Sequence, residues 1–345
     1  IAGRGALSSF GDARAARSAP GNGIRIRYGA TGSVRQRTLK ESIHASGIGL
    51  HSGDKVYMTL RPAPANTGIV FRRLDLPEPA DVPADALRVT ETTLGTTIAE
   101  GGVHVGTVEH LMSAFAGLGI DNAFVDLTAA EVPIMDGSAA PFVEAIDSVG
   151  LRELSEPRRY IKILRPVRVQ EGECWGELTP YASFRLDVEI DFPTPLIGRQ
   201  RLGLEMSPGV FRNEIARART FGFMHDVEKL WKAGLALGAS LDNTVAIGED
   251  RILNVEGLRH PQEFVRHKML DAVGDLALAG APIRGAFRSR CGGHALNHAV
   301  LKALFADRSA WRFSAGVAPA RGEMRPDIGA RIAFGVQPAL APDRS

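Results

Sequence analysis

Cysteines and long apolar runs are scarce in this sequence. Its 345 residues include only two cysteines, Cys174 and Cys291, and these lie far apart in the chain. Two such residues suggest no disulfide framework, and they fit a reducing compartment. No apolar run approaches the roughly 20 residues of a membrane-spanning helix. With 44% hydrophobic and 23% charged residues, the composition is that of a globular protein.

A strong net charge is also absent, since the formal value is only +2. Residues 1–37 hold seven arginines and one acid, Asp12, so the rest of the chain has 34 basic and 38 acidic residues. That body has no basic stripe interleaved with aromatic residues, and we expect no nucleic-acid partner. We expect residues 1–34 to be a disordered extension. The Arg-rich, acid-poor composition of residues 1–35 also fits an organelle transit peptide or a translation start assigned too early.

The order of predicted elements repeats once along the chain. Short β runs bounded by Gly, Pro and Asn precede pairs of helices whose apolar residues recur every three or four positions. Thr107 and Ser138 are the predicted N-caps of the first pair, and a linker is predicted around Pro157. Helices are predicted at 107–119, 136–150, 265–280 and 294–305, and strands within 35–53, 55–64, 67–76, 92–106, 121–127, 160–172, 183–192 and 282–290.

These elements predict an α+β fold with two similar domains, residues 35–155 and 156–318, followed by a tail at 319–345. Each domain packs two helices against one face of a sheet, and the two helical layers meet. An apolar insertion at about residues 219–248, with a short helix between two strands, interrupts the second domain. The pattern alone favours a small satellite core there, and the alternative is a groove or tunnel for an apolar ligand.

A mostly apolar helix of the second domain carries a line of polar groups. His267, Asp271 and Asp275 are spaced four residues apart, so they stack on one face. His267 and Asp271 can reach one point in space, as two metal ligands do, although a hydrogen-bonded pair is more frequent at this spacing alone. Glu109-His110 holds the matching place in the first domain. If the domains face each other, His110 completes three ligands with an open position, as in catalytic zinc sites.

The residues around this set suit metal-assisted amide hydrolysis. Glu109 can take a proton from a metal-activated water that attacks a carbonyl. His294 lies at a loop-to-helix junction, where it is either a helix start satisfied by backbone groups or a cationic general acid for a departing amine. Asp275 can raise the pKa of His294 by its charge.

Other familiar catalytic signatures are missing. The sequence has no HExxH metalloprotease motif, no GxSxG nucleophile elbow and no phosphate-binding P-loop. The glycine-rich "GIGLHSG" follows a hairpin pattern rather than the start of a βαβ unit, so a dinucleotide fold is disfavoured. His51 within it is predicted to be a loop residue rather than a ligand.

Seven stretches of the sequence occur together in one order: "RTLK…GIGLHSG", "RPAPANTGIVFRR", "TVEHLMSAFAGLGIDNAFVDL", "EVPIMDGSAAPFVEAI", "ARTFGF", "EFVRHKMLDAVGDL" and "GHALNH". They resemble the UDP-3-O-acyl-N-acetylglucosamine deacetylases, zinc amidases of bacterial lipid A synthesis, and the resemblance runs from about Gln36 to about Phe305. It implies two β-α-α-β sandwiches with their helices facing inward, each with a small insertion, and an active site between them.

The resemblance also implies a role for each matching residue. The implied zinc ligands are His110, His267 and Asp271, with Glu109 as general base, His294 as general acid, Asp275 orienting or charging that histidine, and Thr220 stabilising the tetrahedral intermediate. The implied substrate-binding residues are Lys268, a cation near the site, Phe221 at the glucosamine and nucleotide side, and Met224, Val227, Leu235 and Ala236 along an acyl-chain passage.

The expected cofactor is Zn²⁺, and ferrous iron is the alternative because two histidines and an aspartate suit both ions. The expected partner is the acylated UDP-N-acetylglucosamine, and its lipid chain permits transient proximity to a membrane surface. A monomer in the bacterial cytoplasm is expected. The chain departs from the family pattern at Asp191–Gly198, "DFPTPLIG", which loses a histidine, and at His298, where asparagine is expected.

Two other functions compete with the deacetylase. One is a non-catalytic protein that binds a nucleotide sugar or lipid on the same fold. The other is a metal amidase acting on a different acetylated sugar.

Overall fold

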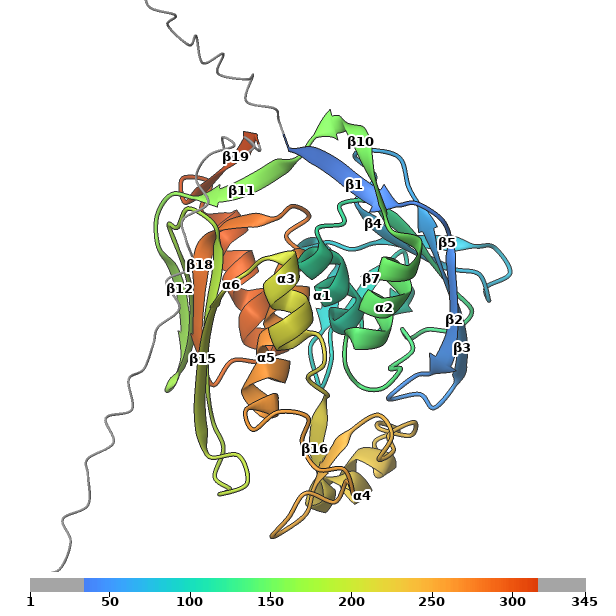
Figure 1. Cartoon of the computed structure of the whole chain (residues 1–345), viewed down its shortest axis with the longest axis vertical. Coiled ribbons are helices and arrows are strands. Elements are labelled where there is room, and N and C mark those ends of the chain that lie inside the picture. The colour runs from blue at the N-terminus through green and yellow to red at the C-terminus, as the bar shows by residue number, and fades with distance from the viewer. Residues whose placement is uncertain (1–33, 316–345) are drawn as a thin grey trace, which may run out of the picture.

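A five-stranded sheet from the first part of the chain forms one outer layer of the computed structural model, which describes residues 34–315 (Figure 1). Its side chains alternate, and those of Val56, Met58 and Leu60 face the core. The central strand, β9, follows the first helix and runs parallel to β4. In order across the sheet the strands are β2 (Ile43–Ile48), β3 (Lys55–Pro62), β9 (Ala123–Leu127), β4 (Ile69–Arg73) and β5 (Ala80–Pro83).

A seven-stranded sheet from the second part forms the opposite outer layer (Figure 1). Leu186, Val188 and Ile190 alternate inward along one of its strands. Its central strand, β18, follows a helix and runs parallel to two neighbours. The strands are β12 (Val167–Glu171), β13 (Cys174–Thr179), β18 (Ile283–Arg290), β11 (Arg159–Ile163) and β19 (Trp311–Ala315), with β14 (Phe184–Asp191) pairing β18 and β15 (Arg199–Glu205) pairing β14.

Four helices lie between the two sheets, and α1 packs directly on α5 at the centre (Figure 1). α6 covers the seven-stranded sheet, and α2 contacts both α1 and β2. Nearly every residue of α1 and α5 is buried, because each helix meets other elements on several sides. The helices are α1 (Glu109–Leu118), α2 (Ala140–Val149), α5 (Glu263–Ala277) and α6 (His294–Ala306).

Smaller elements complete the described part of the chain. β6 (Val89–Glu91), β7 (Thr97–Glu100) and β8 (Val103–Val105) form a three-stranded sheet after the short helix η1 (Ala86–Arg88), and β1 (Arg35–Leu39) pairs with β10 (Leu151–Pro157). α3 (Pro208–Val210) and the π-helix η2 (Phe211–Ile215) precede β16 (Phe221–Phe223), α4 (Met224–Lys232) and β17 (Val245–Ile247). Among residues 34–315, no helix is both long and apolar enough to cross a membrane.

The α+β class and all four central helices are confirmed, as is the insertion's short helix between two strands. Gly119 and Gly150 end their helices with positive φ. The matching places of β9 and β18 are consistent with two similar halves, although the division into two domains and its boundaries stay predictions. The predicted tail and almost all of the predicted extension lie outside the described residues.

Three local predictions are wrong. The predicted linker around Pro157 is strand on both sides, because β10 pairs with β1 and β11 joins the large sheet. Thr107 is not an N-cap: its hydroxyl donates a hydrogen bond to Glu131 and its φ is +54°. Ser138 lies one residue before the N-cap Ala139, although its Oγ accepts a hydrogen bond from the Ala140 amide. Apart from β10, five strands lie where none is predicted: β5, β6, β13, β15 and β19.

Candidate metal centre and active site

The two histidines predicted to converge do so. The ring of His110, in the first turn of α1, lies edge-on to that of His267 on α5, with 5.0 Å between ring centroids. Oδ1 of Asp271, one turn along α5, lies 3.6 Å from His110 Nε2 and 3.3 Å from His267 Nε2. The three ligand atoms lie within 4.8 Å of one another, and all three residues are buried. Tight packing of α1 on α5 therefore brings three potential metal ligands to one point.

The chemistry of these three residues fits a divalent metal. Asp271 Oδ1 is buried and accepts no hydrogen bond within residues 34–315, a costly state that a cation would relieve. Burial lowers the pKa of His267 to about 3, so its imidazole is neutral and available as a ligand at pH 7. The backbone oxygen of Ala218 lies 3.0 Å from His267 Nδ1 and accepts a hydrogen bond from its N–H group, which leaves Nε2 facing Asp271.

Lys268 supports the same carboxylate from the other side. Its Nζ donates a 3.0 Å hydrogen bond to Asp271 Oδ2 and lies 5.6 Å from the centre of the Phe221 ring. Burial by itself would lower the pKa of Lys268, but the Asp271 charge raises it above its usual value. Burial would likewise raise the pKa of Asp271, yet His267 and Lys268 hold it well below its usual range. The lysine is therefore a cation at the edge of the site.

Glu109 and His294 face each other beside the three ligands. Glu109 Oε1 lies 3.8 Å from His294 Nε2, and its Oε2 accepts a 2.9 Å hydrogen bond from the backbone amide of Thr96. The carboxyl group is almost completely buried, and this burial raises its pKa. A carboxylate with a raised pKa has the basicity that a general base near neutral pH requires.

Asp275 holds His294 in place. Its Oδ2 accepts hydrogen bonds of 2.9 Å from His294 Nδ1 and from Asn297 Nδ2, and its Oδ1 accepts one of 2.6 Å from the Thr96 hydroxyl. Burial alone would lower the pKa of His294, but the charges of Asp275 and Glu109 raise it to about 9. His294 is therefore protonated at neutral pH, as a general acid must be.

The ligands and facing groups line a cavity of about 310 Å³. Most of the predicted site residues border it: His110, His267, Asp271, Glu109, His294, Thr220, Phe221 and Lys268. Asp275 lies behind His294. The four residues predicted along the acyl passage, Met224, Val227, Leu235 and Ala236, do not border this cavity and are all partly exposed on the insertion.

The insertion nevertheless contacts the loop between β2 and β3. The backbone amide of Leu237 donates to the His51 carbonyl, and the Ala236 amide lies 3.4 Å from His51 Nδ1. His51 is a loop residue, as predicted. The departure at Asp191–Gly198 also comes close to the site, since the Phe192 ring lies 5.7 Å from that of Phe221.

Several supporting residues are absent from the sequence predictions. Thr96 joins Glu109 to Asp275, and Asn297 fixes Asp275 from α6. The segment that ends in Thr220 is held by a buried pair in which Arg219 Nε donates a 2.9 Å hydrogen bond to Glu263. Asn297 follows His294 by three residues on the same helix, so helical spacing could have predicted that both side chains face Asp275. No local pattern in the sequence identifies Thr96 as a residue of the site.

A buried set of two histidines and one aspartate, bordered by a carboxyl group and a protonated imidazole on an α+β scaffold, defines a candidate metal-dependent hydrolase. The sequence comparisons narrow this class. Residues 36–306 match the family model described as LpxC, UDP-3-O-acyl N-acetylglycosamine deacetylase. The chain belongs to this deacetylase family, as its resemblance predicted.

Curated relatives with the same family name align with this chain over nearly their whole length. Each of three is named UDP-3-O-acyl-N-acetylglucosamine deacetylase and is 52% identical to this chain. The proteins of Acidithiobacillus ferrooxidans and Xanthomonas campestris pv. campestris (strain B100) align over 282 residues, which is 81% of this chain and 93% of each relative. That of Pseudomonas entomophila aligns over 280 residues, covering 81% of this chain and 92% of the relative.

Proposed function

We propose that this protein hydrolyses the N-acetyl group of UDP-3-O-(3-hydroxyacyl)-N-acetylglucosamine and releases acetate, a step of lipid A and hence lipopolysaccharide biosynthesis. Family membership and the names of the relatives support this substrate and reaction. The observation that carries the proposal is the convergence of His110 and His267 with Asp271 beside Glu109 and His294.

His110, His267 and Asp271 would hold one divalent ion, which we propose is zinc, with ferrous iron as the alternative. When bound, such an ion supplies Lewis-acid chemistry, polarising the acetyl carbonyl and making water more acidic. The neutral state of His267 and the ionised state of Asp271 are the forms that such binding requires.

Glu109 would accept the proton of the attacking water. Its carboxyl group is anchored by the Thr96 amide at one oxygen, so the other oxygen faces the cavity and His294. The raised pKa that burial gives Glu109 makes it a stronger base than an exposed carboxylate. Thr220, at the border of the same cavity, would donate its hydroxyl proton to the negative oxygen that develops as the carbonyl is attacked.

His294 would donate a proton to the glucosamine nitrogen as the C–N bond breaks and acetate forms. Its pKa of about 9 keeps the proton on the ring at neutral pH. Asp275 is the positioning residue, because it fixes the Nδ1 side of the ring and leaves Nε2 facing Glu109. Glu109 and His294 thus supply a base and an acid next to each other at the border of one cavity.

Substrate contacts complete the proposal. Lys268 and Phe221 border the cavity and would bind the sugar and nucleotide side. Met224, Val227, Leu235 and Ala236 would line the passage for the acyl chain, with the chain's lipid character allowing transient contact with a membrane surface. We further propose that the protein acts as a monomer in the bacterial cytoplasm.

Metal content measured together with acetate release tests this function. The purified protein should bind about one metal ion per chain and release acetate from the acylated UDP-sugar, and His110→Ala should lose both. A protein without metal or activity would favour a non-catalytic binding protein. Equal rates on acylated and non-acylated substrates would favour a metal amidase of another acetylated sugar.

A further inference from the structure

The two cysteines of the chain lie opposite each other on neighbouring strands, although they are far apart in the sequence. β13 and β18 are antiparallel, and Trp175 pairs with Arg290. One step further in the same register, Cys174, the first residue of β13, lies opposite Cys291, which directly follows β18. Both cysteines are free and partly exposed. The seven-stranded sheet therefore brings the only two thiols of the chain together.

The position of this pair in the ladder suits a covalent bond. The backbone amide of Cys291 donates a 2.9 Å hydrogen bond to the Glu189 carbonyl on β14, so it points away from β13. Cys174 and Cys291 thus form a non-hydrogen-bonded pair, the type in which facing Cα atoms of antiparallel strands are about 4.5 Å apart. Disulfides bridge Cα atoms that are about 4.4–6.8 Å apart. The backbone therefore needs little movement to accept a disulfide here.

The two thiols also interact directly. Burial raises the pKa of the Cys291 thiol, and a hydrogen bond with the Cys174 thiol raises it further. The backbone at Cys291 has a φ of +52°, which is in the left-handed region that residues other than glycine rarely adopt. Non-glycine residues held in this region cluster at active sites, ligand sites and switches. The thiols are therefore in contact, and one of them belongs to a strained strand end.

We propose that Cys174 and Cys291 are a dithiol site, which a small disulfide such as oxidised glutathione converts reversibly into an internal disulfide. The facing positions of two free, partly exposed thiols on β13 and at the end of β18 carry this inference. In a reducing compartment such bonds are transient and serve catalysis or redox sensing.

The reaction consists of two thiol–disulfide exchanges. One cysteine thiolate attacks a sulfur of the oxidant, which forms a mixed disulfide and releases one glutathione thiolate. The second cysteine thiolate attacks the protein sulfur of that mixed disulfide, which forms the bond between Cys174 and Cys291 and releases the other glutathione thiolate. Two protein sulfurs are oxidised, two glutathione sulfurs are reduced, and the protons of the protein thiols pass to the released thiolates.

The dithiol site is next to the general acid of the proposed function, on which the following expectation rests. Residues 291–293 lead from β18 into α6, whose first residue is His294. Gly293 and His294 both border the cavity of the metal ligands. A disulfide would tie the start of this short segment to β13 and displace His294. Because small displacements of a catalytic group reduce the rate strongly, oxidation should lower turnover by on the order of ten-fold.

Mass spectrometry of the full-length protein after treatment with oxidised glutathione tests the proposal. The intact mass should fall by two hydrogen atoms, the protein should stay monomeric on a non-reducing gel, and peptide mapping should find Cys174 linked to Cys291. Dithiothreitol should restore both thiols. Glutathione attached to either cysteine without an internal link, or a disulfide-linked dimer, would overturn the proposal.

Variants test the placement of the two thiols. Cys174→Ser should stop at the mixed disulfide with glutathione, because the second thiol is missing. The matched control, Cys174→Ser with Gln170→Cys, keeps two thiols but moves one to β12, two strands from β18. Gln170 is exposed and pairs with Trp175, so its Cα is about 9–10 Å from β18, beyond the reach of a disulfide. An internal link in this control at the wild-type rate would refute the role of the strand register.

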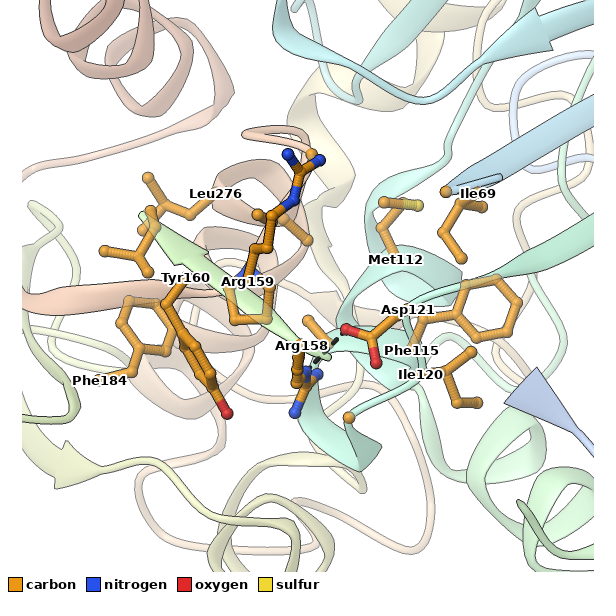
Figure 2. A pocket seen from close by; sticks show the side chains of 18 of the residues that line it. Ile69, Met112, Phe115, Ile120, Asp121, Arg158, Arg159, Tyr160, Phe184 and Leu276 are labelled. Atoms are coloured by element: carbon orange, nitrogen blue, oxygen red, sulfur yellow. Dashed lines mark hydrogen bonds and ion pairs between the residues drawn. The ribbon is translucent and has the colours of Figure 1, made fainter. Parts of the chain in front are cut away.

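Hydrogen–deuterium exchange and turnover of the oxidised wild type, before and after dithiothreitol, test the effect on His294. Exchange should change at residues 291–297, and turnover should recover on reduction. Residues 115–121 are the internal reference, because they border a separate cavity of about 600 Å³ at the far end of α1. Arg158 Nε donates a 2.7 Å hydrogen bond to Asp121 there (Figure 2).

The two readouts separate this proposal from the proposed function. A reduced protein without turnover would contradict the proposed function alone, because the disulfide is measured by mass. A fully linked protein with unchanged turnover and exchange would refute the effect on His294.

Discussion

Gly274 on α5 lies directly against the backbone of Glu109 on α1, so closely that an added Cβ would be 2.0 Å from the Glu109 carbonyl oxygen. The neighbouring atoms are also backbone, at 2.8 and 3.0 Å, and cannot rotate away. The two helices can therefore bring His110 and His267 together only because this position has no side chain.

Gly274→Ala should push the two helices apart. We expect the free energy of unfolding to fall by on the order of 1–3 kcal/mol, as in other overpacked cores. Bound metal should fall well below one ion per chain, because the separation acts between His110 and His267. Denaturant unfolding and metal analysis measure the two effects.

Gly209→Ala is the matched control for this change. An added Cβ there meets no atom within 4 Å, and Gly209 does not have a positive φ. Stability and metal content should stay unchanged. Normal metal content in Gly274→Ala would show that the close contact does not set the ligand geometry.

Removing either proton-transfer group should impair chemistry rather than folding. Glu109→Ala and His294→Ala should each keep metal and a normal unfolding midpoint while turnover falls roughly 10²-fold or more. Steady-state acetate release with metal analysis on the same samples provides the test. Near-normal rates in both variants would reject the assigned base and acid.

The pH dependence of turnover should report the protonation of His294. Burial lowers its pKa, but Asp275 and Glu109 raise it to about 9. Because the protonated ring is the proposed acid, turnover should fall as pH rises through that value. Asp275→Asn removes a raising charge, so the alkaline fall should move to lower pH. A lower rate with an unmoved alkaline fall would mean that Asp275 has only a structural role.

The acyl passage is tested at Ala236. Its φ of +57° is left-handed, a conformation that asparagine tolerates well. Ala236→Glu should weaken binding of a long-chain substrate while leaving a short-chain one unaffected, because a charge would have to be desolvated beside the chain. Ala236→Asn, which is polar but uncharged, should have a smaller effect. Equal affinity of all three proteins for the long-chain substrate would exclude Ala236 from the passage.

Local patterns determined much of the candidate site. Apolar residues at helical spacing predicted α1 and α5, and the four-residue spacing of His267, Asp271 and Asp275 placed them on one face. These predictions succeeded because they depend only on the geometry of one helix. Strand pairing depends on residues far apart in the sequence. The prediction of a linker around Pro157 is wrong for this reason, because β10 pairs with the distant strand β1.

The sequence by itself determined the four central helices, the polar face of α5 and the chemical types of the groups that converge. Only the tertiary structure decided that His110 meets His267, which is 157 residues away, and that Thr96 joins Glu109 to Asp275. The physical reason is that helical periodicity fixes neighbours within one element, whereas the approach of α1 to α5 depends on close packing at Gly274 and on the sheets that cover both helices.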